Sequence, residues 1–109
     1  MSTQIAWAMV GIAGILEVCW AIGLKYTEGF TKLVPSIFTV ICLALSMYLL
    51  ARCSQVLPIG TTYGIWVGIG AFGAAIVGII LFNDSASPAR IFFIVLLLVS
   101  IIGLKLTAE

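Results

Sequence analysis

Polar residues interrupt the apolar sequence at only a few points, and four long apolar stretches lie between them. The first stretch spans residues 4–24 and carries a single charge, Glu17. The other three contain no charged residue and span 34–51, 57–82 and 91–104. A bilayer core about 30 Å thick is crossed by about 20 helical residues. The pattern therefore predicts an all-α membrane protein with one domain of four transmembrane helices, at about 4–25, 33–51, 57–82 and 88–106.

The connections between these stretches are short, so consecutive helices are expected to run antiparallel, with both termini on one side. The third stretch is the longest and is rich in glycine. Because glycine is a weak helix former, we expect a break and a hinge at Gly68-Ile69-Gly70. Gly60, Gly64 and Gly68 also repeat the spacing that lets membrane helices approach closely. That face packs either against helices of the same chain or against a second copy.

Composition agrees with a lipid environment and excludes several classes of protein. Hydrophobic residues make up 63% of the 109 residues and charged residues 8%, whereas soluble domains carry about a quarter. The net charge of +1 offers no basic surface for nucleic acid. Histidine is absent, and the three cysteines show no metal-binding spacing. We therefore predict no metal, no cofactor and no enzyme activity.

Positive charges are nearly balanced between the two sides of the predicted membrane protein. Arg52 and Lys105 fall on the side of the termini, and Lys25, Lys32 and Arg90 fall on the other. Membrane proteins orient by an excess of Lys and Arg on the cytoplasmic side, and here the counts are two and three. We expect the chain to insert in both orientations and to pair as an antiparallel homodimer.

Glu17 is the one acid inside a predicted span. It lies about 13 residues, or about 20 Å, into the first helix. A charged carboxylate at this depth costs a few kcal/mol, and intramembrane acids usually mark a proton or ion pathway. The alternative is a structural ion pair, but Lys25 on the same helix is about 12 Å away. The position favours a group that exchanges a proton for a cation.

A small set of residues completes a candidate cation site around this acid. Gly14 and Trp20 share the helix face of Glu17, one leaving space and the other supplying an indole. Aromatic faces attract cations. The candidates on the second and third helices are Ser46, Tyr63 and Trp66. For Tyr63 and Trp66 the alternative is an aromatic belt at the membrane surface.

Several segments resemble the small multidrug resistance (SMR) transporters, and the resemblance covers essentially the whole chain. They are Leu16-Glu17-Val18-Cys19-Trp20-Ala21-Ile22-Gly23-Leu24-Lys25, Gly29-Phe30-Thr31-Lys32-Leu33, Leu57-Pro58-Ile59-Gly60-Thr61-Thr62-Tyr63-Gly64-Ile65-Trp66 and Gly68-Ile69-Gly70-Ala71. Trp20 and Lys105 are similar to the guanidinium-exporter branch. The departures are Phe82-Asn83-Asp84-Ser85, in place of a glycine-and-glutamate loop, and Gly64, in place of the more usual alanine.

The resemblance implies proton-coupled antiport of guanidinium by an antiparallel homodimer in the bacterial inner membrane. It implies that Glu17 of both protomers binds proton and substrate in turn, and that Trp20, Ser46, Tyr63 and Trp66 line the site. Two alternatives are an exporter of quaternary ammonium or other drug cations within the same family, and a non-transporting membrane subunit of a larger complex.

Overall fold

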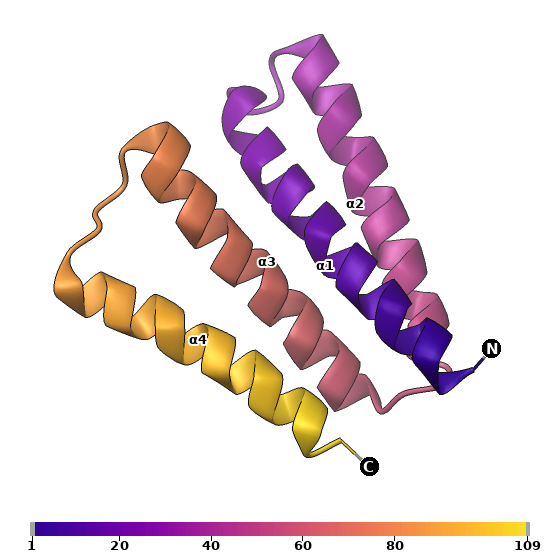
Figure 1. Ribbon diagram of the computed structural model, residues 1–109. Coiled ribbons are helices and arrows are strands. Elements are labelled where there is room, and N and C mark those ends of the chain that lie inside the picture. The colour runs from indigo at the N-terminus through magenta and orange to yellow at the C-terminus, as the bar shows by residue number, and fades with distance from the viewer. Residues whose placement is uncertain (1, 109) are drawn as a thin grey trace.

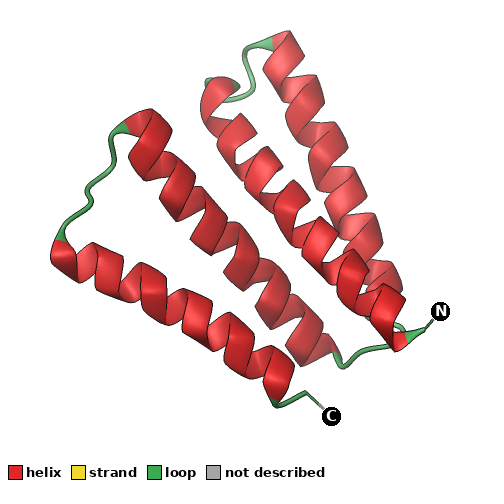
Figure 2. Cartoon of the chain, viewed as in Figure 1, coloured by secondary structure: helices red, strands yellow, loops and turns green. Residues whose placement is uncertain are grey.

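The computed structural model describes residues 2–108, and every regular element in that range is an α-helix (Figure 2). The helices are α1 (Thr3–Tyr26), α2 (Leu33–Cys53), α3 (Ile59–Phe82) and α4 (Pro88–Leu106). Each is long and apolar enough to cross a membrane. The prediction of an all-α chain with four spanning helices is confirmed.

Two helix boundaries differ from the expected ranges by two residues. The third helix begins at Ile59 instead of residue 57, because Pro58 is extended (ψ 136°) and its carbonyl accepts the first helical hydrogen bond, from the Thr62 N–H at 3.0 Å. The second helix ends at Cys53 instead of residue 51, because the charge of Arg52 does not interrupt it. The Arg52 guanidinium lies exposed and donates to the Tyr48 hydroxyl at 3.3 Å.

The α1 helix packs against both α2 and α3, α2 also touches α3, and α4 packs on α3 (Figure 1). The Cα atoms extend over 40 × 36 × 16 Å, so the molecule is flattened along one direction. The α4 helix packs on α3, and its Lys105 Nζ reaches α1, 5.7 Å from the ring centroid of Trp7. Both termini lie at the same end (Figure 1). Because α4 packs on α3 and not on α2, residues 2–108 of one chain do not close around a central chamber.

Glycines of α3 lie against two neighbouring helices, α1 and α4, and Gly64 and Gly68 are those that meet α4. A methyl group at Gly68 would lie 2.6 Å from Cγ1 of Ile101, and one at Gly64 would lie 3.1 Å from Cδ1 of Leu104. Gly64 and Gly68 thus bring α4 close to α3 within one chain, which is the first of the two alternatives for this face. The α-helix continues through Gly68 and Gly70, so the break expected there is not present in this conformation. The hinge stays a prediction.

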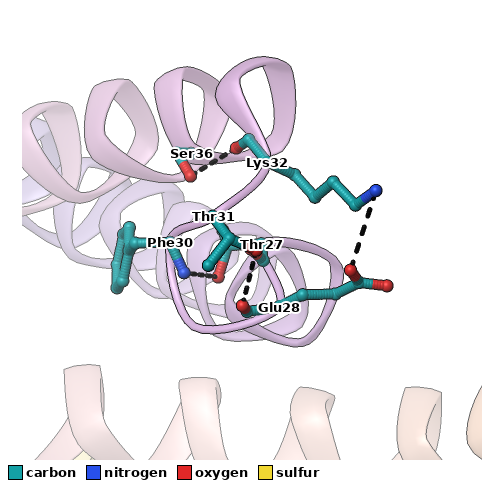
Figure 3. Close-up of polar contacts among 6 residues, drawn as sticks. All are labelled: Thr27, Glu28, Phe30, Thr31, Lys32 and Ser36. Atoms are coloured by element: carbon teal, nitrogen blue, oxygen red, sulfur yellow. Dashed lines mark hydrogen bonds and ion pairs between the residues drawn. The ribbon is translucent and has the colours of Figure 1, made fainter.

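The loop between α1 and α2 is held by short-range polar contacts (Figure 3). The Thr27 hydroxyl donates to the Leu24 carbonyl at 2.7 Å and accepts from the Phe30 N–H at 3.2 Å. Lys32 Nζ lies 3.8 Å from Glu28 Oε2 (Figure 3). Both side chains of this pair are exposed, so it contributes little to stability. Because of this pair, Glu28, the one acid of this loop, already has a basic partner.

The loop after α3 departs from the expected sequence pattern and nevertheless ends the helix regularly. Asn83 adopts the left-handed conformation (φ 54°) that glycine usually supplies at a helix end. The Asp84 N–H donates to the Gly78 carbonyl at 3.1 Å, and the Asp84 carboxylate lies against Gly78. Asparagine tolerates this conformation better than other residues with a Cβ. The altered loop therefore keeps the helix end.

Candidate functional site

Glu17 lies in the middle of α1, directly opposite Gly70 of α3. A methyl group at Gly70 would overlap the carboxyl carbon and Oε1 of Glu17, so glycine is what admits the side chain here. The other oxygen, Oε2, is buried and has no hydrogen-bond partner among residues 2–108. Gly70, which the sequence suggested as a helix-packing or hinge position, is thus the residue against which the acid packs.

Trp20 presents a second unpartnered polar group one turn further along α1. Its indole N–H is buried and, within the described part of the chain, has no acceptor. Gly14, three residues before Glu17, is buried against Ile69 of α3, and a methyl group there would lie 2.7 Å from Cγ2 of Ile69. Gly14 is therefore a close helix contact and not open space next to the acid.

Ser46 and Trp66 form a bridge between three helices. The Ser46 hydroxyl donates to the Ala13 carbonyl of α1 at 2.7 Å, and the Trp66 indole N–H donates to the Ser46 oxygen at 2.8 Å. Ser46 is fully buried and Trp66 is 7% exposed. A residue this buried between helices does not fit an aromatic belt at the membrane surface. Sequence reasoning missed the Ala13 carbonyl, since no residue type marks an accepting backbone group.

Tyr63 lies next to this bridge and is itself largely exposed. Its ring centroid lies 5.7 Å from that of Trp66, with the planes tilted by 47°. Tyr63 is 54% exposed, so in this chain alone its face is available to a neighbour. The belt alternative remains open for Tyr63 alone.

The predicted residues thus fall into two adjacent groups. Glu17 and Trp20 form one, and Ser46, Trp66 and Tyr63 form the other. Ala13 precedes Glu17 by one helical turn, about 6 Å along the axis. In this conformation the Ser46 proton goes to Ala13, and no hydrogen bond joins Ser46 to Glu17 among the described residues. The two groups share one face of α1 without touching through a hydrogen bond.

The electrostatics of Glu17 argue against a structural ion pair. Over residues 2–108 the one ion pair is Lys32–Glu28, in the loop. The same residues hold no group of His, Cys, Asp and Glu suited to a metal ion. An acid buried at mid-helix without a cation can take up either a proton or an organic cation that donates N–H bonds.

We predict that Ser46→Ala destabilises the protein by about 1–3 kcal/mol, because it leaves the Trp66 N–H without its acceptor and the Ala13 carbonyl without the hydroxyl proton. Thermal unfolding in mild detergent would measure the loss. Ser54→Ala is the matched control, since the Ser54 hydroxyl bonds only locally, to the Ala51 carbonyl, at an exposed helix end. Equal melting temperatures for the two variants would contradict the bridge.

Comparison with known proteins places this arrangement in a family. Residues 5–97 match the family model described as Small Multidrug Resistance protein. A guanidinium exporter of Salmonella typhimurium is 55% identical over 104 residues, which is 95% of this chain and 99% of that protein. A guanidinium exporter of Yersinia pseudotuberculosis is 55% identical, over 94% of this chain and 99% of that protein. A guanidinium exporter of Citrobacter freundii is 53% identical, over 95% of this chain and 99% of that protein. With four spanning helices and a buried intramembrane acid, the chain belongs to the small multidrug resistance family of membrane transporters.

Proposed function

We propose that this chain is a proton-coupled antiporter that exports guanidinium across a bacterial inner membrane, working as a single transporter domain. The observation that carries the proposal is the buried, unpartnered carboxylate oxygen of Glu17 beside the unpartnered indole N–H of Trp20. Relatives named guanidinium exporters at 53–55% identity support the choice of cation.

In this mechanism, proton and guanidinium compete for the same carboxylate. Guanidinium is planar, weakly hydrated and rich in N–H donors, and it matches a carboxylate in paired hydrogen bonds. The indole of Trp20 offers a face for cation–π contact. Because Glu17 cannot hold both ligands at once, each crossing carries either the cation or a proton, and the empty, charged site does not change its access. That competition couples the two gradients.

The Ser46–Trp66 bridge is the second element of the mechanism. It holds α2 and α3 at a fixed distance from α1, one turn from the acid. When the hydroxyl rotates from the Ala13 carbonyl to Glu17, it stabilises the charged carboxylate after the cation has left. Tyr63, stacked at a tilt on Trp66, then borders the cation from the open side. We assign these three residues to positioning and lining.

A second copy of the chain in the opposite orientation completes the site. The four helices of one chain do not close around a chamber, and a transport pathway needs a wall on the other side of Glu17. The nearly balanced loop charges favour both orientations equally. Reporters of compartment on each terminus are expected to label both sides of the membrane. One orientation for nearly all molecules would overturn this part.

Quaternary ammonium export is the alternative within the family. A quaternary ammonium ion has no N–H group, so it leaves the Glu17 oxygens without donors. The unpartnered oxygen therefore favours guanidinium.

The test is proton movement in proteoliposomes driven by an outward guanidinium gradient and followed by a pH-sensitive dye inside the vesicles. We expect proton uptake with guanidinium and weaker uptake with tetramethylammonium. The reverse order, or no proton movement, would overturn the proposal.

A further inference from the structure

A groove runs along the outer face of α1, between α2 and α3, at the end where α1 stops. Its volume is about 550 Å³. Its walls include Val18, Ile22 and Tyr26 of α1, Pro35 and Phe38 of α2, and Val77 of α3. Ile22 lies five residues beyond Glu17, about 140° around the helix axis. The groove therefore faces away from the transport site.

Tyr26 lines the end of this groove, which we call its mouth, and a cation and a second aromatic ring lie next to Tyr26. Lys25 Nζ lies 5.0 Å from the ring centroid of Phe82, and the rings of Tyr26 and Phe82 are 5.6 Å apart. Within residues 2–108, Lys25 has no carboxylate partner, because the acid of this loop, Glu28, pairs with Lys32 (Figure 3). The mouth thus combines an available positive charge with an aromatic rim.

The depth of the groove corresponds to one leaflet of the bilayer. From Tyr26 to Val18 the α1 helix rises by about 12 Å, and half of the hydrocarbon core is about 15 Å. We propose that this groove binds one phospholipid with an anionic headgroup. One of its two acyl chains lies along Ile22, Phe38 and Val77, and its phosphate lies at Lys25. Basic residues at the ends of spanning helices are the usual partners of such headgroups.

The dimensions and charge distinguish a lipid from the other possible occupants. An organic cation would be repelled by Lys25 at the mouth. A helix of a second copy would need an apolar channel across both leaflets, about 30 Å long. The groove is less than half that length and ends at mid-membrane. A single acyl chain with a charged head satisfies both the length and the charge.

The experiment is native mass spectrometry of the full protein released from mild detergent, with phosphatidylglycerol or phosphatidylcholine added. We expect the parent to retain phosphatidylglycerol about tenfold more than phosphatidylcholine, equivalent to about 1.4 kcal/mol. Lys25→Gln should remove that preference, whereas Arg52→Gln, which loses the same charge outside the groove, should keep it. Ile22→Trp, which fills the groove, should reduce retention of both lipids.

Three results would overturn the proposal. The first is equal retention of the two lipids by the parent. The second is the same loss of preference in Arg52→Gln as in Lys25→Gln, which would indicate general charge attraction. The third is an Ile22→Trp variant that falls apart into single chains while its lipid retention is unchanged, which would identify a second copy as the occupant. Circular dichroism of each variant establishes that the helices are intact, and Ile22→Phe replaces any Ile22→Trp protein that does not fold.

Discussion

Replacing Glu17 with glutamine is expected to reduce guanidinium-driven proton movement in proteoliposomes to the level of empty vesicles. The amide keeps the shape of the side chain, so its packing against Gly70 should persist. It cannot take up and release a proton, and it does not attract a cation as a carboxylate does. Both halves of the exchange therefore fail together. The measurement is the dye-reported pH change after a guanidinium gradient is imposed.

The matched control is Glu28→Gln in the exposed loop between α1 and α2. This substitution also removes one negative charge, and the only contact that it breaks is the exposed ion pair with Lys32. We expect this variant to transport at close to the parent rate, since exposed pairs contribute little to stability. Exchange that survives in Glu17→Gln would show that the proton is carried elsewhere, and the proposed mechanism would then be abandoned.

Gly70→Ala is expected to weaken guanidinium binding by about tenfold to a hundredfold. The new methyl group would overlap the Glu17 carboxyl carbon and Oε1, so the side chain must move. Overpacking at a close contact costs about 1–3 kcal/mol, and about 1.4 kcal/mol corresponds to a factor of ten. Isothermal titration of the protein in detergent with guanidinium would measure the change directly.

Gly60→Ala is the control for this substitution, because nothing lies within 4 Å of a methyl group at Gly60 on the same helix. It also stiffens α3 in the same way, since alanine favours the helix over glycine by about 1 kcal/mol. We expect binding by this variant to equal that of the parent. Should Gly70→Ala bind guanidinium normally yet transport slowly, Gly70 would serve as the hinge and not to admit Glu17.

The sequence alone determined the elements of this protein and the depth of its acid. Long uncharged runs specify spanning helices without any tertiary information, because every backbone polar group in lipid must be satisfied within its own helix. The position of Glu17 within such a run was therefore readable from spacing, as was the near balance of loop charges. Boundaries shifted by two residues only at Pro58 and Arg52, where local hydrogen bonding decides the first or the last turn.

Only the tertiary structure decided which helix faces meet. In a soluble protein, an apolar stripe along a helix shows which face is buried. Here lipid and protein interior are equally apolar, so the helices have no such stripe. The sequence therefore could not assign Gly64 and Gly68 to α4, place Gly70 against Glu17, or join Ser46 to both Ala13 and Trp66. These contacts depend on how side chains of different helices fit together, and that fit is a property of the packed helices and not of any one helix.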